Sequence, residues 1–393
     1  MRVTITTPGK FPPAFHAARY HETRGELARI ISPVPYERTS QFGVSRERSA
    51  SLTPLGVWNY GVQTYGPRSV QRPHQLLFSA AFDEIAAHMI GDSDVVNCWC
   101  STALRTIRAA HARGIPAVLE VASAHVATQS RLLREEGRRW GTDVDRAGLE
   151  SGVIDRTVAE YDEADRIIVP SSFVRRTFVE QGVPGSKIAV LPYGIDATPT
   201  AMRREHDGPP RILFVGGATL RKGIPYLIEA FRLLQFDAAL RIVGARNEAL
   251  FQRLGGLPKG AVATGPKAGA DLALEYASAD IFVLPSIEDG YGLVAAEAMS
   301  AGVPVIVSDR AGASELVQDG VNGFVVPAGD SGALAALIND LLADPDRRRR
   351  MGANARATAR SRTWDAYGDD RYERVYAPLL GLRSREVVDA AAA

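Results

Sequence analysis

The sequence has few cysteines and almost no net charge. Cys98 and Cys100 are the only cysteines among 393 residues. Two thiols are too few for a four-ligand zinc site. They are also poorly placed for a disulfide, because they lie two residues apart on one predicted strand. We therefore expect both to be buried small side chains in a reducing compartment. The formal net charge of +1 argues against a nucleic-acid-binding protein, which would carry a strong basic excess.

The sequence also lacks a long apolar run. No segment approaches the roughly 18 apolar residues that cross a bilayer, and no signal peptide is recognisable, so we expect a cytoplasmic protein. Charge is uneven, however, because residues 1–75 contain ten Arg and Lys against four Glu. This stretch could meet an anionic acceptor or the inner face of the cell membrane in a peripheral contact. It could equally be a set of scattered, solvated arginines.

Short β-branched runs alternate with helix-period segments through most of the chain, which is typical of parallel sheets with crossover helices. Residues 36–75 are polar and rich in Gly and Pro, and they predict loops with short helices. The predicted strands lie at 1–7, 27–32, 93–99, 116–121, 166–169, 188–191, 211–215, 240–243, 281–284, 303–307 and 323–326.

The chain is too long for one ordinary core. Residues 197–210 have the composition of a linker, which places a domain boundary there. The expected fold class is therefore α/β, with two doubly wound Rossmann-like domains over residues 1–198 and 199–393. Residues 363–382 predict a helix near the end of the chain.

The most informative segment is PSIEDGYGLVAAEAMSAG, residues 285–302. It lies where a strand ends and a helix begins, at the sheet edge where open α/β folds bind ligands. Gly290 and Gly292 allow a tight turn and a close approach to a ligand. The amides of Tyr291, Gly292 and Leu293 would then lie at a helix N-terminus, where they can receive phosphate oxygens.

Two carboxylates flank this turn. Asp289 precedes it and Glu297 follows inside the helix. Each could accept hydrogen bonds from a polyol, the sugar hydroxyls at one end and the ribose hydroxyls at the other. The alternative is that Asp289 only caps the helix and Glu297 lies on a solvated face.

A second glycine-rich turn follows the strand at 211–215. In FVGGATLRKG, Gly216 and Gly217 precede Arg221 and Lys222, just before a helix. Lys222 is placed to neutralise a diphosphate, although a surface lysine is the alternative. The segment is not a Walker A loop, because the Gly-x4-Gly-Lys-Ser/Thr order is missing.

The span from Asp289 to Glu297 resembles the acidic-x7-Glu motif of retaining GT-B glycosyltransferases of family 4. The first acidic residue of that motif is usually Glu. Here it is Asp289, preceded by Glu288, so which carboxylate meets the sugar is open. The family's Arg, five residues before the Lys, is Gly217 here. Arg221 would supply the missing cation, or the diphosphate is held by one side chain fewer and activity is reduced. The resemblance covers roughly residues 165–380, including runs similar to the family at 187–196, 276–286 and 312–324.

The resemblance implies a GT-B fold whose domains face a central cleft, with the nucleotide sugar on the second domain and the last helix, about 364–382, crossing back to the first. It implies a retaining, metal-independent hexosyltransferase. The nucleotide-diphosphate sugar would be the co-substrate, with no further cofactor. The acceptor would be a glycan or a lipid-linked sugar, in cell-surface polysaccharide synthesis. Catalytic roles would fall to Lys222, Asp289, Glu297 and His125.

The first half offers three candidates for acceptor binding. His125 follows the strand at 116–121, and family members often keep a histidine near this place, although a lone histidine is more often structural. His16 lies on the first predicted helix. Lys10 could partly replace the family's Gly-Gly loop, which is missing after the first strand.

Other functions remain open. The glycine at position 217 would suit a non-catalytic sugar-nucleotide-binding protein. A nucleotide-sugar epimerase or phosphorylase of the same fold would need acids and bases in the first half that we do not find. A nicotinamide dehydrogenase is disfavoured, because no Gly-x-Gly-x-x-Gly follows a strand. No acidic cluster predicts a metal site. The sequence does not identify the base, the sugar or the acceptor.

Overall fold

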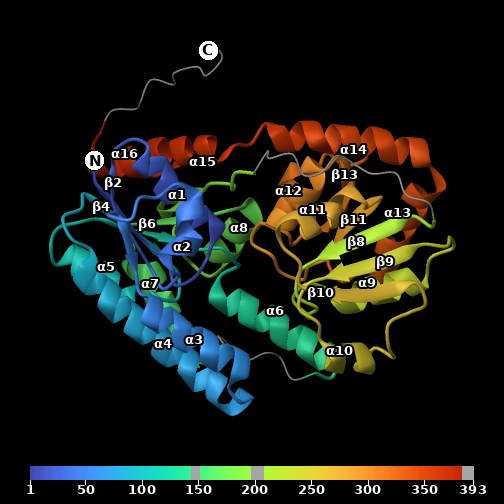
Figure 1. Cartoon of the computed structure of the whole chain (residues 1–393), viewed down its shortest axis with the longest axis horizontal. Helices are drawn as coiled ribbons and strands as arrows, with labels where there is room; N and C mark the ends of the chain where they lie inside the picture. Colours follow the sequence, from blue (N-terminus) through green and yellow to red (C-terminus); the bar gives the residue numbers. More distant parts are fainter. Residues whose placement is uncertain (143–150, 196–207, 383–393) are drawn as a thin grey trace, which may run out of the picture.

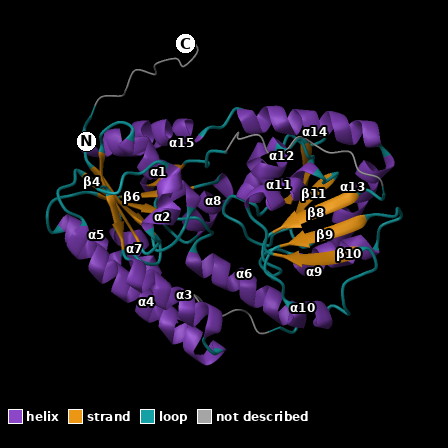
Figure 2. Cartoon of the chain, in the orientation of Figure 1, coloured by secondary structure: helices purple, strands orange, loops and turns teal. Residues whose placement is uncertain are grey.

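The computed structural model describes residues 1–142, 151–195 and 208–382. Two parallel sheets carry helices on their faces (Figures 1 and 2). The first sheet has the order β3-β2-β1-β4-β5-β6-β7 and the second β10-β9-β8-β11-β12-β13. The predicted α/β class with two doubly wound sheets is confirmed. The boundary predicted at residue 198 lies outside the described residues.

The inner strands of the first sheet are short and largely buried on both faces, as parallel strands under helices must be, whereas the edge strand β3, Ser-Ala-Ser, is half-buried. Its strands are β1 Val3–Thr6, β2 Leu27–Ser32, β3 Ser49–Ser51, β4 Val95–Trp99, β5 Ala117–Glu120, β6 Arg166–Val169 and β7 Ile188–Val190. Its helices are α1 Pro12–Glu22, α2 Tyr36–Thr39, α3 Thr53–Tyr65, α4 Arg68–Met89, α5 Leu104–His111, α6 Val126–Arg139, α7 Ser151–Glu163 and α8 Ser172–Glu180.

The second sheet repeats the pattern. Its strands are β8 Arg211–Val215, β9 Ala239–Val243, β10 Ala261–Gly265, β11 Ile281–Leu284, β12 Val305–Ser308 and β13 Gly323–Val326. Its helices are α9 Ile224–Arg232, α10 Glu248–Arg253, α11 Gly269–Ala277, α12 Leu293–Ser300, α13 Ser331–Ala343 and α14 Pro345–Arg360. The edge strand β10 and the helices α10 and α14 were not predicted from the sequence.

The prediction of loops with short helices over residues 36–75 is wrong for its second part. Helix α3 has 13 residues, and α4 begins at Arg68 and continues for 22 residues. One of the glycines that argued against a helix, Gly56, serves packing here. A Cβ on Gly56 would lie 2.0 Å from the carbonyl oxygen of Pro33, so only glycine lets α3 approach that loop.

The end of the chain packs on the first half. Helix α15 Trp364–Arg371 lies beside α1 (Figure 1), and a π-helical turn over Tyr372–Tyr376 leads to α16 Ala377–Leu380. The fully buried Arg371 guanidinium pairs with Glu120 at the end of β5, 2.6 Å away. Arg371 also donates to the hydroxyls of Tyr367 and Tyr376. A buried ion pair therefore joins the last helices to the first sheet.

None of the helices in the described ranges is both long and apolar enough to cross a membrane. Cys98 is buried, Cys100 is half-buried, and both are free thiols.

Candidate functional site

The two glycine-rich segments lie side by side, because β8 and β11 are neighbours in the second sheet. The backbone of Gly223, at φ +71°, ends the turn after β8, and a Cβ there would lie 1.8 Å from the carbonyl oxygen of Pro285. The amide of Ile287 donates to the carbonyl of Arg221 across 2.9 Å. This close packing brings the cations at 221–222 against the carboxylates at 288–289.

Each of the two cations faces one of the two carboxylates. Lys222 Nζ is hydrogen-bonded to Asp289 Oδ2. Arg221 Nη1 lies 3.5 Å from Glu288 Oε2. Burial alone would raise the pKa of Asp289, but the charges of Lys222 and Arg221 outweigh it and lower that pKa below its usual value. Asp289 is therefore held ionised beside the cations.

Glu288 is committed to contacts with the first half of the chain. Its side chain is fully buried, and it accepts hydrogen bonds from the amide of Ala124 and from Gln129 Nε2, both at 2.8 Å. Asp289, by contrast, is the carboxylate bonded to Lys222 of the turn after β8. Sequence reasoning missed Gln129, which nothing in its local sequence distinguishes.

The loop after β11 also touches the first half through Gly290. A Cβ on Gly290 would lie 2.0 Å from the carbonyl oxygen of Ala122. The carbonyl of Gly290 accepts from Ser171 Oγ across 2.8 Å. Ser171 also caps α8. The two halves therefore meet directly beside the predicted site.

Helix α12 begins at the second glycine of the turn. Gly292 is its N-cap at φ +80°, and a Cβ there would lie 2.7 Å from Leu284 Cδ2. The amide of Tyr291 bonds to the Asp289 carboxylate. The Tyr291 hydroxyl donates to the carbonyl of Tyr193 in the first half, 3.0 Å away. The amides of Gly292 and Leu293 lie in the first turn of α12, where the helix dipole favours an anion.

Glu297 lies one turn further along α12. It is half-buried and accepts a hydrogen bond from the Tyr276 hydroxyl at 2.7 Å. Tyr276 is buried, so it fixes the orientation of the carboxylate, and sequence reasoning did not find it.

The turn after β8 has open space where the family's arginine is missing. A Cβ on Gly217 would meet only Thr219 Cγ2, at 3.8 Å. Gly244, in the loop after β9, is required to be glycine, because a Cβ on it would lie 2.0 Å from the carbonyl oxygen of Gly216. The loops after β8 and β9 are thus in contact, and Gly217 faces free volume.

The three acceptor candidates contact residues outside the cluster formed by Arg221, Lys222, Glu288 and Asp289. His125 caps α6 through Nδ1, and its ring packs on Tyr161 and Phe178. The His16 ring stacks on Trp364 at 4.0 Å between centroids, and Lys10 is exposed, with its ammonium 5.7 Å from the Phe42 ring centroid. Capping and packing account for both histidines without a ligand, so their acceptor roles stay predictions.

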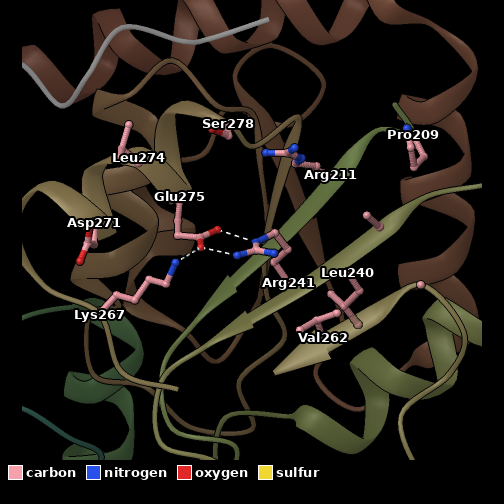
Figure 3. A pocket seen from close by; sticks show the side chains of 12 residues that line it. Pro209, Arg211, Leu240, Arg241, Val262, Lys267, Asp271, Leu274, Glu275 and Ser278 are labelled. Carbon is pink, nitrogen blue, oxygen red and sulfur yellow. Dashed lines mark hydrogen bonds and ion pairs between the residues drawn. The ribbon is translucent and has the colours of Figure 1, made fainter. Parts of the chain in front are cut away.

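A separate groove of about 500 Å3 lies over the face of the second sheet. In Figure 3, Glu275 points toward Arg241 and Lys267, and it pairs with each at 2.5 Å. Glu275 is thus shared between two cations, and none of the predicted site residues lines the groove. Elsewhere within the described ranges, no three His, Cys, Asp or Glu side chains are grouped to hold a metal ion.

Two family models match the chain. "Glycosyltransferase Family 4" matches residues 39–198 and "Glycosyl transferases group 1" matches residues 201–358. The chain belongs to the family 4 glycosyltransferases. The second model spans the turn at 216–223 and the acidic segment at 288–297, which is where the family resemblance of the sequence is strongest.

Curated relatives are similar over part of their length. The chain is 36% identical over 208 residues to the D-inositol 3-phosphate glycosyltransferase of Xylanimonas cellulosilytica. The matched segment covers 47% of this chain and 50% of the relative. The chain is 33% identical over 235 residues to the GDP-mannose-dependent alpha-mannosyltransferase of Mycolicibacterium smegmatis, covering 57% and 60%. The chain thus spans about half the length of the curated relatives it matches.

Solved structures share the fold at low identity. Sucrose-phosphate synthase from Thermosynechococcus elongatus superimposes with a TM-score of 0.71 at 20% identity, covering 97% of this chain and 99% of the other. Anabaena HepE in complex with UDP-glucose gives a TM-score of 0.71 at 18% identity, covering 96% and 100%. The fold is therefore that of the GT-B glycosyltransferases.

Proposed function

We propose that this glycosyltransferase-family chain transfers a hexosyl group from a nucleotide-diphosphate sugar to a glycan or lipid-linked acceptor. The observation that carries the proposal is the paired arrangement of Arg221 and Lys222 with Glu288 and Asp289 beside the N-terminus of α12. A diphosphate would take the cations and the amides of Gly292 and Leu293. The sugar would then lie against Asp289.

The chemistry follows from where charge develops. The bond between the anomeric carbon and the diphosphate oxygen breaks, and negative charge grows on the leaving diphosphate. Lys222 and Arg221 would stabilise this charge in the transition state. The acceptor oxygen forms the new bond to the anomeric carbon, and its proton passes to the leaving diphosphate. Glu297 would bind the ribose hydroxyls.

Retention of anomeric configuration, independence of metal ions and the absence of a cofactor are part of the proposal and rest on the family resemblance. So does a role in cell-surface polysaccharide synthesis. Relatives named for GDP-mannose and for phosphatidyl-myo-inositol make a GDP- or UDP-sugar and a lipid-linked acceptor the first substrates to try. A lipid-linked acceptor would also require contact with the membrane at its inner face.

The test is a panel of UDP-, GDP-, ADP- and dTDP-sugars in the presence of EDTA, followed by thermal shift and by donor hydrolysis. We expect one donor to stabilise the protein and to be hydrolysed slowly, and Glu297→Ala to abolish both effects. Failure of every nucleotide sugar to bind would contradict the site assignment. Binding without hydrolysis or transfer to any acceptor would favour the non-catalytic sugar-nucleotide-binding alternative.

A further inference from the structure

Exposed apolar side chains are concentrated on one helical hairpin of the first half. Of the sixteen large hydrophobic side chains that are exposed in the described residues, seven fall between residues 57 and 77. They are Val57, Trp58, Tyr60, Tyr65, Val70, Leu76 and Leu77. Apolar side chains at such density on a free surface mark an interaction site.

The hairpin consists of α3 and the first half of α4, which pack against each other. Trp58 lies edge-on to His74 at 4.1 Å, and His74 Nε2 is 3.1 Å from Asn59 Oδ1. None of the α3 side chains is buried. Figure 1 shows the joined ends of α3 and α4 projecting at the lower edge of the view, away from the first sheet. The hairpin therefore has internal contacts that hold it together and an apolar outer face.

The composition of the hairpin specifies its partner. From Ser49 to Phe82 the sequence contains no Asp, Glu or Lys and two arginines, Arg68 and Arg72. A segment without negative charge meets no repulsion from an anionic surface. Tyr60, 64% exposed, and Tyr65, 80% exposed, carry amphipathic rings of the kind that settle at the boundary between lipid headgroups and acyl chains.

The amphipathic helix α6 is excluded as the binding surface, because its apolar side is already covered. Leu132 is buried in a cluster with Tyr226 and Ile287 of the second half. The Trp140 indole, directly after α6, packs on the Tyr226 ring, and Glu136 accepts from the Tyr226 hydroxyl at 2.7 Å. Helix α6 bridges the two halves, which leaves the α3–α4 hairpin as the apolar surface that faces outward.

We propose that the outer face of the α3–α4 hairpin docks on an anionic lipid bilayer. Its apolar and aromatic side chains enter the headgroup region, and the surface charge of the lipid adds an attraction that salt screens. The inference rests on the proposed function in one respect: docking would bring the chain to the bilayer that holds a lipid-linked acceptor. Docking itself requires no donor and no turnover.

The experiment is co-sedimentation of the full chain with vesicles of equal parts phosphatidylglycerol and phosphatidylcholine, with pure phosphatidylcholine vesicles for comparison. We expect sedimentation with the anionic vesicles, weakened by added salt. The triple variant Tyr60→Ser, Tyr65→Ser, Leu77→Ser should bind about tenfold or more weakly. The matched variant Leu233→Ser, Phe236→Ser, Val262→Ser, which changes exposed apolar residues of the second half, should bind as the wild type does.

Quenching of the wild-type protein supplies a readout that does not depend on the triple variant folding. Brominated lipid should quench a part of the tryptophan fluorescence that Trp58→Phe removes. The proposal is overturned by absent sedimentation with anionic vesicles, by a triple variant that binds as well as the control, or by quenching that Trp58→Phe leaves unchanged. A dimer in analytical ultracentrifugation that the triple variant dissociates would assign the face to a second copy instead. Donor binding is measured separately, so its failure would not be confused with failure of docking.

Discussion

Arg371→Met should destabilise the first half of the protein strongly, although Arg371 lies near the end of the chain. Its guanidinium is fully buried, pairs with the buried Glu120 and donates to two tyrosine hydroxyls. The coulombic attraction of Glu120 raises the pKa of Arg371 against the opposing effect of burial. The methionine variant would leave the Glu120 carboxylate buried without its counter-charge.

Breaking a buried ion pair from one side costs about 3–5 kcal/mol. For a half of this size that corresponds to a fall in Tm of about 10 °C. Arg19→Met is the control. Arg19 of α1 also ties α15 to the first half, through Asp365 at 3.4 Å, but both of these side chains are exposed. A surface pair is worth about 0.2–1 kcal/mol.

The assay is urea unfolding combined with hydrogen exchange of residues 364–380. We expect Arg371→Met to lower the free energy of unfolding and to speed exchange in these helices, and Arg19→Met to change neither by more than about 1 kcal/mol. Adding Glu120→Gln to Arg371→Met should recover part of the loss, because it removes the unpaired charge. Equal effects of the two single variants would refute the claim that the buried pair anchors the last helices.

Two further predictions concern the contact between the halves and the pH dependence of stability. Gly290→Ala should displace the loop after β11 and lower Tm by several degrees, because its Cβ would lie 2.0 Å from the carbonyl oxygen of Ala122. Gly217→Ala is the control, because its Cβ would make only an ordinary contact, with Thr219 Cγ2 at 3.8 Å. Equal Tm values for the two variants would contradict the contact at Gly290. Burial and the Arg19 charge lower the pKa of His16 from 6.5 to about 4, so the unfolded chain binds a proton between these values that the folded protein does not. The contribution of His16 to the free energy of unfolding should therefore fall by about 3 kcal/mol as pH drops from 6.5 to 4. His16→Gln should flatten the pH dependence of urea unfolding in that window. A pH dependence that His16→Gln leaves unchanged would contradict this prediction.

The sequence predicted the parts of the fold that repeat a local pattern. Buried β-branched strands alternating with amphipathic helices specify two parallel sheets. The helix α3 escaped prediction, because Gly56 and Gly61 have low helix propensity and tertiary packing against Pro33 and α4 overrides it. Of these two glycines, Gly56 is required by that packing, whereas a Cβ on Gly61 would meet nothing within 4 Å.

The candidate site was predictable where it depends on strand ends. The carboxyl edges of neighbouring strands bring the turn at 216–223 and the segment at 288–297 together, and both were identified from glycine spacing. The pairing of Glu288 with Gln129 was not predictable, because it joins residues 159 positions apart. The packing of the His125 ring on Tyr161 and Phe178 was not predictable either, because both rings come from distant positions in the sequence.

The central claim is that Arg221 and Lys222 form a diphosphate site opposite Asp289. The most direct measurement is calorimetric titration of UDP and GDP in EDTA into the wild type, Lys222→Met and the exposed control Lys259→Met. The account predicts that one nucleotide binds and that Lys222→Met weakens it about tenfold or more, since a charge-assisted hydrogen bond is worth about 1.5–3 kcal/mol. Lys259→Met should bind as the wild type does. Equal affinity for the two variants, or no binding of either nucleotide, would contradict the account.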